Sequence, residues 1–474
     1  MRRLIATVIP LSLLFSACTL GPDYERPATM LPEVHRGLEV APVDASDLAH
    51  EKWWALFGDP VLDQLIETAL SENRDVQIAA ARIEEARARF RVTHADRLPQ
   101  VGASFEALRE QESPATSPGA QPEDTLEALV TVSWEVDLWG RLRRADERAR
   151  ADLLATVEAQ RGVILSLVAD VAGAYFELRD IDQRLAMAQA TVDTRKDSLE
   201  IAILRFEGGL TSQLEVRQAE TELAKAEVMV PDLEYARAKK EHHLCILLGR
   251  NPGDIRRGLE LAEQSVPPEV PAGLPSDLLE RRPDIRAAEQ ALVAANADVG
   301  VAIAGLYPQL SLSGFGGSGS EDLNEILSSG TGMWELLGNL TAPLWQGGRL
   351  RAEVQASKSR FEQQALIYDQ TILQALREVA DALAAVASAQ STLESQRRLE
   401  LASRQYLELA ALQYANGVVA YLDVLDAQRQ LFSAELALST ATLNRLSAVV
   451  ALYRALGGGW ATATELADRF TETS

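Results

Sequence analysis

The sequence predicts a mainly α-helical chain of two tandem repeats, each carrying a β-hairpin that belongs in a membrane barrel. Residues 140–249 recur without insertion or deletion as residues 348–457, at a constant offset of 208. Each copy contains a proline-free stretch of coiled-coil length, and each follows two segments in which apolar and polar residues alternate. Because one added residue turns the rest of a helix by about 100°, the constant offset indicates helices whose lengths must agree.

Long helical hairpins are expected at residues 141–249 and 349–457. The stretch Arg141–Phe206 runs for 66 residues without proline, and it would extend about 100 Å as a helix. Its apolar residues recur at spacings of three and four, and alanine is frequent among them. This pattern is typical of coiled-coil helices that pack closely against more than one neighbour.

β-hairpins are expected at about residues 98–138 and 307–345. Apolar and polar residues alternate from Val130 to Leu138, which indicates a strand with one apolar and one polar face. The repeat extends backward through this region with an offset of 209, since residues 73–100 align with residues 282–309. The one-residue difference therefore falls in the β-hairpin region, where a loop can absorb it.

Four strands of this kind are too few to close a barrel, because the smallest single-chain membrane barrels have about eight. A membrane sheet also cannot leave its edges open. We therefore expect several copies of the chain to complete one sheet. A soluble module with ordinary buried strands is the alternative on pattern alone, since the sequence signal of each barrel strand is weak.

The N-terminus has the pattern of a bacterial export signal. Two arginines precede the apolar run Leu4–Phe15, which is too short to span a membrane and is followed by small residues before Cys18. Residues 1–17 resemble a lipoprotein signal peptide, which implies that Cys18 becomes the lipidated first residue. Thr19 stands where an aspartate would retain a lipoprotein in the inner membrane, so the resemblance implies delivery to the outer membrane. An ordinary cleaved signal with a chance cysteine is the alternative.

The expected organisation follows from these boundaries. The signal peptide, residues 1–17, precedes an N-terminal periplasmic segment with the lipid anchor, residues 18–70. Repeat 1 covers residues 71–265 and repeat 2 covers residues 266–457, each with a helix, a β-hairpin and a helical hairpin in that order. Residues 458–474 form a C-terminal tail.

Composition argues against several functional classes. The net charge of −23 disfavours nucleic acid as a partner. Five histidines and two cysteines show no zinc-binding or catalytic spacing, so neither an enzyme nor a metal site is expected. With Cys18 modified, Cys245 would be the only free thiol, and no intramolecular disulfide could form. The covalent lipid on Cys18 is the one attached group that we expect, and no cofactor is expected.

The order of motifs along nearly the whole mature chain resembles one family, the TolC-type outer-membrane efflux channels, in the lipoprotein branch often called NodT-like. The motifs are Cys18–Pro27; Trp53, Trp54, Phe57, Asp59, Pro60 and Leu62; Asp137–Arg141; Arg282–Asp284; Pro343–Trp345 with Gly347–Arg349; and Leu422–Ala427. The resemblance implies a homotrimer whose twelve strands close one barrel in the outer membrane and whose helices form a tunnel across the periplasm. It also implies a passive exit duct for small molecules, supplied by an inner-membrane transporter through a periplasmic adaptor. The alternative is a periplasmic coiled-coil scaffold or adaptor lipoprotein without a pore, which would leave the β-hairpins unexplained.

Two helical reversals mark the expected periplasmic aperture. Gly208-Gly209 and Asn416-Gly417 interrupt the long helices at equivalent positions, where glycine or asparagine can adopt the left-handed conformation of a tight reversal. In the family this end of the molecule forms the aperture. The resemblance therefore implies that these turns also receive the adaptor.

Acidic residues beside the second turn are the expected gate. The resemblance implies that Asp423 and Asp426 of three copies form a ring of six carboxylates, which would bind cations and repel anions. The ordinary alternative is that both are solvated acids at the start of a helix, where the helix dipole stabilises them.

The latch of this chain is expected to differ from that of the family's well-studied members, in which a tyrosine and an arginine hold the aperture shut. Tyr414 fits the tyrosine position, but Val419 stands where the arginine would be. A hydrogen bond between Tyr414 and Glu215 is expected instead. Leu214 and Leu422 are expected to close the aperture by packing.

Overall fold

The structure, a computed structural model, describes residues 19–29, 31–36, 52–113, 115–265, 275–326 and 328–458. The expected signal peptide, Cys18 and all but the first residue of the expected tail lie outside the described residues. The described chain forms two compact units. The first unit contains residues 82–157 and 287–369 with the described part of residues 1–29. The second contains the described parts of residues 30–81, 158–286 and 370–474.

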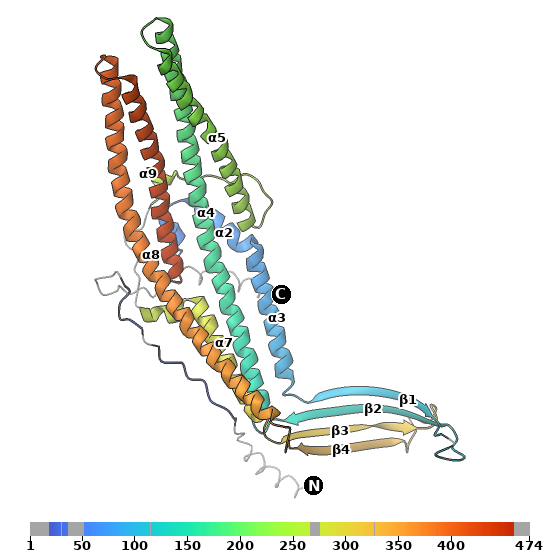
Figure 1. Ribbon diagram of the computed structural model, residues 1–474. Helices are drawn as coiled ribbons and strands as arrows, with labels where there is room; N and C mark the ends of the chain where they lie inside the picture. The colour runs from blue at the N-terminus through green and yellow to red at the C-terminus, as the bar shows by residue number, and fades with distance from the viewer. Residues whose placement is uncertain are drawn as a thin grey trace. The chain divides into compact units, whose positions relative to one another are not determined.

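The first unit contains one antiparallel sheet in the order β1-β2-β3-β4 (Figure 1). Repeat 1 supplies β1, Gln100–Glu110, and β2, Glu123–Val136, while repeat 2 supplies β3, Gln309–Ser320, and β4, Gly332–Thr341. The pairing of β2 with β3 joins the two hairpins into this sheet. The repeats of the sequence are therefore interleaved in the fold, because each compact unit takes a part of both.

The two outer strands of the sheet are open within the described chain, since β1 pairs only with β2 and β4 only with β3. Both outer strands expose large apolar side chains, namely Val101 and Phe105 on β1 and Trp334 and Leu336 on β4. The two residues of each strand lie on one face, because successive side chains of a strand alternate between faces. An exposed apolar face gains free energy when it is buried, and an unpaired backbone edge can pair with a further strand. Among the described residues of one chain, the sheet is therefore incomplete.

The long helices recur in pairs of equal length. α3, Arg74–Ala95, and α7, Pro283–Ala304, have 22 residues each and start 209 positions apart. The helices of the two hairpins have 67 and 35 residues in both repeats, and their bounds differ by 208 at every end. These pairs are α4, Arg141–Glu207, with α8, Arg349–Ala415, and α5, Gln213–Leu247, with α9, Tyr421–Ala455.

A glycine in the left-handed conformation ends the first helix of each hairpin. Gly209 follows α4 with a φ of 69°, and Gly417 follows α8 with a φ of 72°. After α4, the amide of Leu210 donates to the carbonyl of Arg205 at 2.8 Å, and the equivalent bond follows α8. This pattern is a Schellman motif, which satisfies carbonyl groups that a helix end leaves free. Both tight reversals therefore form where the sequence predicted them.

An aromatic core in the second unit ties the N-terminal segment to the long helices. The short helix η2, Trp53–Phe57, supplies two of its rings. Trp53 stacks on Tyr453 of α9 with 5.1 Å between ring centroids, and Phe57 meets Phe176 of α4 edge to face at 4.9 Å. All four rings are buried. Such contacts combine large apolar burial with a preferred ring geometry.

The buried carboxylate of Asp59 holds three distant segments together in this unit. It begins α2, Pro60–Glu72, by accepting from the amide of Val61 at 2.9 Å. It also accepts from the Tyr175 hydroxyl at 2.7 Å and from the Leu259 amide at 3.0 Å. Burial alone would raise the pKa of this carboxyl, but its hydrogen bonds outweigh burial and lower the pKa. The connector between the repeats is thus fixed against α4.

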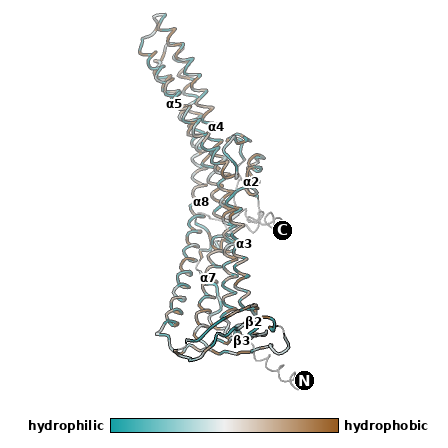
Figure 2. Tube along the Cα trace, turned by 90° about the vertical axis from the view of Figure 1, so that its right-hand side faces the viewer, coloured by the Kyte–Doolittle hydropathy of each residue, from teal (hydrophilic) through white to brown (hydrophobic). Residues whose placement is uncertain are grey.

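Helix α9 is, among the described helices, the one long and apolar enough to cross a membrane by length and composition, and half of its most apolar window is buried in the chain itself. Figure 2 shows apolar and polar residues mixed along the long helices. This mixture is typical of helices that pack side by side and keep a wet face. The remaining short helices are η3, Leu261–Glu263, η4, Pro275–Asp277, and α6, Leu278–Arg281.

Candidate functional site

Side-chain contacts join the two helical hairpins beside their turns, with Tyr414 at their centre. The Tyr414 ring lies 5.5 Å from the ring of Tyr421, and the guanidinium carbon of Arg205 lies 4.8 Å from its centroid. Burial first, and then the charge of Glu215, raise the pKa of the Tyr414 phenol. Glu215, at the start of α5, therefore lies near the Tyr414 phenol at the end of α8, and the hydrogen bond expected between them stays a prediction.

The arginine at this site comes from the first repeat. Arg205 lies in the last turn of α4, whereas the family pattern directed attention to Val419. A cation above an aromatic ring contributes about 0.5–2 kcal/mol. Arg205 gave no distinct signal in the sequence, because a basic residue in the last turn of a helix is already explained by the helix dipole. The available clue was the repeat itself, since the counterpart of Arg205 is Gln413, the residue before Tyr414.

The two expected gate acids lie in the first turns of α9. One oxygen of Asp423 accepts from the amide of Ala420 at 3.0 Å, so this residue caps the helix. Asp426 accepts from the side-chain amide of Gln430 at 2.7 Å. Partial burial and then the charges of Asp426 and Asp423 raise the pKa of Tyr406 on α8. Each chain therefore presents two carboxylates on the side of α9 that faces Tyr406, and a ring would need further copies.

Apolar side chains are exposed at the ends of both hairpins. Leu214 and Leu422 occupy equivalent positions in the two repeats, and they are 65% and 54% exposed. Leu210 and Val418, the residues directly after the two turning glycines, are also exposed. Scattered exposed apolar side chains need no explanation, but four at equivalent positions beside two turns are typical of a surface that a partner covers.

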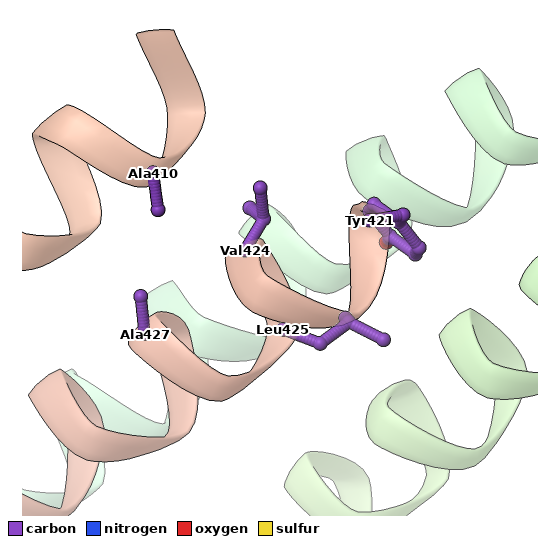
Figure 3. Close-up of a cluster of buried hydrophobic side chains, with 5 residues drawn as sticks. All are labelled: Ala410, Tyr421, Val424, Leu425 and Ala427. Atoms are coloured by element: carbon purple, nitrogen blue, oxygen red, sulfur yellow. The ribbon is translucent and has the colours of Figure 1, made fainter. Parts of the chain in front are cut away.

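A small apolar cluster supports the start of α9 beneath these residues. Its members are Ala410 on α8 and Tyr421, Val424, Leu425 and Ala427 on α9 (Figure 3). Leu407 and Tyr414 of α8 pack against the cluster. Because these residues hold α9 against α8, Leu422 and the two acids project from a fixed base.

Two buried charged side chains of the first hairpin, Arg195 and Glu222, bind residues of α9 about two turns further along that helix. We call Arg195, Glu222, Lys225, Gln428 and Arg429 the charge cluster. Glu222 on α5 is 5% exposed and accepts from Arg429 at 2.6 Å and from Lys225 at 3.0 Å. The hydrogen bond from Arg429 is the main reason that the pKa of Glu222 falls to about 2, against the opposing effect of burial. Arg195, a buried residue of α4, donates to Gln428 on α9.

These contacts join helices rather than converge on one reacting atom. Within the described parts of the chain, no group of three or more His, Cys, Asp or Glu side chains could hold a metal ion. What the site offers is a set of charged hydrogen bonds, ring contacts and apolar packing between two hairpins. Such contacts can hold the hairpin ends together and can be broken without covalent chemistry.

The sequence model of the outer membrane efflux protein family matches the chain twice, at residues 65–250 and 274–458. Each match covers most of one repeat of the sequence. Together they cover most of the chain and include both turns and all the gate residues named above.

Solved and curated relatives agree with this match over nearly their full length. The probable efflux pump outer membrane protein TtgC of Pseudomonas putida is 35% identical over 467 residues, covering 97% of this chain and 96% of that protein. The cation efflux system protein CusC of Escherichia coli is 33% identical over 451 residues, covering 95% and 97%. The structure of the outer-membrane channel OprN aligns with a TM-score of 0.87 at 34% identity, covering 94% and 100%. The predicted fold class is confirmed, and the chain belongs to the outer membrane efflux protein family.

Proposed function

We propose that this protein is the outer-membrane channel of a tripartite efflux system, a passive exit duct for small molecules. In this system an inner-membrane transporter delivers cargo through a periplasmic adaptor. The observation that carries the proposal is the combination, in one chain, of an open sheet with apolar outer strands and two helical hairpins of equal length. The apolar face of the sheet is compatible with a membrane, and the mixed polar and apolar helices are compatible with an aqueous compartment. A chain with both parts can form a conduit that passes through both environments.

The open edges of the sheet support a homotrimer. If β1 of one copy pairs with β4 of the next, three copies supply twelve strands, which is enough to close a barrel and remove every edge. The exposed apolar side chains of Phe105, Trp334 and Leu336 would then face lipid. The signal pattern before Cys18 supports a covalent lipid on that residue and anchoring in the outer membrane.

The gate of the proposed channel lies at the joined ends of the hairpins. In a trimer, Asp423 and Asp426 would form a ring of six carboxylates that attracts cations and slows anions. Leu214 and Leu422 would narrow the same opening by packing. Repulsion within the ring favours opening. Two sets of contacts oppose it by holding the hairpins of each copy together: those of Tyr414 with Arg205 and Glu215, and those within the charge cluster.

The two turns are the proposed docking points of the adaptor. They are formed by Gly208, Gly209, Asn416 and Gly417, which the structure leaves exposed. The exposed apolar residues that follow the turning glycines support such an interface, because an apolar surface at a helix end gains free energy when a partner covers it.

The cargo of the system is set by the transporter rather than by this channel. Relatives of nearly equal identity carry different cargo in their names: a toluene efflux pump protein of Pseudomonas putida is 35% identical, and the cation efflux system protein of Escherichia coli is 33% identical. One channel architecture thus accompanies an apolar and a charged cargo. We propose small molecules as the cargo class on this ground.

Conductance in a planar lipid bilayer tests the proposal. We expect the purified protein to form channels, and Asp423→Ala with Asp426→Ala to change their conductance and cation preference. The matched control is Asp193→Ala with Asp197→Ala, which removes two exposed acids from α4. Absence of conductance in the wild type and in the gate variant would favour a coiled-coil scaffold without a pore.

A further inference from the structure

The segment Thr19–Arg26, which we call the strap, contains no helix or strand but is fixed along the first unit. The amide of Leu20 donates to the carbonyl of Trp139 at 3.0 Å. Further along, the side-chain amide of Asn296 donates to the carbonyl of Pro22 at 2.9 Å. The start of a folded chain is poorly ordered unless it is tied down. These bonds therefore indicate that the path of the strap is specified.

Arg144, in the first turn of α4, recognises the backbone of the strap. Its side chain is 4% exposed. Its Nε donates to the carbonyl of Leu20 at 3.2 Å, and one Nη donates to the carbonyl of Gly21 at 3.4 Å and to the carboxylate of Asp23 at 2.7 Å. A buried guanidinium needs such partners, because an unpaired charge away from water is costly. Removing Arg144 would leave the strap without its central contact.

Three glycines make room for the strap. A Cβ atom on Gly21 would lie 2.5 Å from the Cα of Gly300 on α7, and a Cβ on Gly140 would lie 2.9 Å from the Cα of Thr19. A Cβ on Gly300 would lie 2.8 Å from the Cγ of Arg144. Side chains do not fit at these distances, so the slot is built for close approach of one backbone to another.

Glu289 on α7 holds the far end of the strap. Both of its oxygens accept from the guanidinium of Arg26, at 2.6 and 2.7 Å, and the hydroxyl of Tyr24 donates to one of them at 3.2 Å. Glu289 is buried. A bidentate pair between a guanidinium and a carboxylate is among the strongest and most directional contacts in proteins. The strap is thus fixed at both ends and in the middle.

The near end of the strap meets the base of the sheet. Trp139 lies three residues after β2 ends at Val136. Its ring is 5.1 Å from that of Tyr307, and its indole N–H donates to the carbonyl of Pro308 at 2.7 Å. Aromatic side chains gather where a barrel meets the membrane surface. The strap therefore starts at the level where the sheet would leave the membrane.

We propose that the strap couples an N-terminal lipid to the sheet. Arg144 is the positioning residue, because it fixes the strap against the start of α4. Leu20 is bound to Trp139, and two residues span at most about 7 Å, so a lipid attached two residues before Leu20 would be tethered close to the base of the sheet. A short tether raises the effective concentration of the strands at the membrane, which favours their insertion and assembly. This inference rests on the proposed function, in which the sheet lies in the outer membrane.

Hydrogen exchange tests the strap itself. In the purified lipidated protein, we expect Arg144→Ala to speed exchange at the Leu20 amide at least about tenfold, because this variant loosens the segment that carries the amide. Arg148→Ala is the matched control, since Arg148 lies one turn further along α4 and pairs with Asp298 at 2.7 Å. Gly21→Val acts from the strap side and should have the same effect as Arg144→Ala if the latter folds poorly. Exchange unchanged in both Arg144→Ala and Gly21→Val would overturn the proposal.

A comparison with and without the lipid tests the coupling. The same variants are made in a chain exported by a cleaved signal without the cysteine, so that it starts at Thr19 and carries no lipid. We expect Arg144→Ala to lower the temperature at which the lipidated trimer dissociates by about 5–10 °C, and to lower it by less than half as much in the chain without lipid. Equal losses in both chains would show that Arg144 only stabilises the fold.

Efflux measurements separate this proposal from the proposed function. If the wild type restores efflux and the losses in the two chains are equal, the coupling is wrong and the channel function stands. The opposite outcome is also distinct. If the wild type shows no efflux or conductance, but Arg144→Ala lowers the stability of the lipidated protein more than that of the chain without lipid, the channel function is wrong and the coupling stands.

Discussion

Replacing Glu222 by glutamine should loosen the charge cluster and raise the open fraction of the channel. The buried carboxylate of Glu222 binds Arg429 on α9 and Lys225 on its own helix. Glutamine keeps the length of the side chain but removes its charge, so Arg429 retains at most a hydrogen bond to an uncharged acceptor. If the cluster holds the hairpins together in the closed channel, as the proposed gate requires, Glu222→Gln weakens the closed state and leaves the open state unchanged.

The magnitude follows from the pKa of Glu222, which the cluster lowers from 4.5 to about 2. This change corresponds to about 3 kcal/mol of interaction with the charged form. Part of that energy comes from Lys225, which moves with Glu222 because both lie on α5. If half of that energy, ~1.5 kcal/mol, acts between the hairpins, its loss would raise the ratio of open to closed channels about tenfold.

The sign of the pH dependence follows from the same pKa. Because folding lowers the pKa, the stabilisation by Glu222 is fully present above pH 4.5 and is lost as the pH falls from 4.5 toward about 2. The charge cluster should therefore hold the closed state less strongly as the pH falls into this range. Glu222→Gln should already show the raised open fraction at neutral pH and should lose this component of the pH dependence.

Single-channel recording in planar bilayers measures the open fraction directly. The control is Glu220→Gln on the same helix, whose partner Arg217 is exposed; it should leave the open fraction unchanged. Combining Glu222→Gln with Arg429→Ala should add little to either substitution alone, since both break one bond. If Glu222→Gln and Glu220→Gln gave the same open fraction, the charge cluster would not hold the closed state.

Three further substitutions test the neighbouring contacts. Leu422→Ser should raise single-channel conductance with little change in stability, because the side chain is exposed; unchanged conductance would contradict closure by packing. Arg205→Gln should remove the cation above Tyr414, cost about 1 kcal/mol, and raise the open fraction less than Glu222→Gln; a larger rise would place the main latch at Tyr414. Asp59→Asn should lower the free energy of unfolding by about 2–4 kcal/mol at neutral pH, because it leaves donors such as the Tyr175 hydroxyl without a charged acceptor. Since hydrogen bonds lower the pKa of Asp59, this loss should shrink below about pH 4. If denaturant unfolding gave the same loss at neutral pH and below pH 4, the charge of Asp59 would not be its cause.

The lengths and ends of the helices could be predicted from the sequence because they depend on local properties. The gap-free repeat required α4 and α8 to have equal lengths, and the structure gives 67 residues for each. Glycine is the residue that adopts positive φ without strain, so Gly209 and Gly417 marked the reversals. The alternating segments likewise predicted strands, since a period of two is a property of neighbouring residues.

Contacts between the hairpins could not be predicted in the same way. Glu222 and Arg429 are 207 residues apart, and in the sequence each looks like part of the solvated face of a long helix. Whether such a charge is buried depends on which helix lies beside it, and periodicity alone does not specify that neighbour. Arg205 was missed for the same reason, because its partner Tyr414 belongs to the other repeat. The strap was recognised as a motif, but its slot is formed by glycines that only the fold brings together.

The repeats are equal in length but differ at the charge cluster, and this difference has a mechanical consequence in a trimer. The counterpart of Glu222 in the second repeat is Gln430, and the counterpart of Arg429 in the first is Thr221. A ring of six hairpins would alternate between seams within one copy and seams between copies. The pair Glu222–Arg429 can form only at the seams within a copy, because the equivalent positions elsewhere carry no charge. Glu222→Gln therefore weakens three alternate seams and leaves the other three unchanged, so one substitution per chain is enough to test which seams hold the aperture closed.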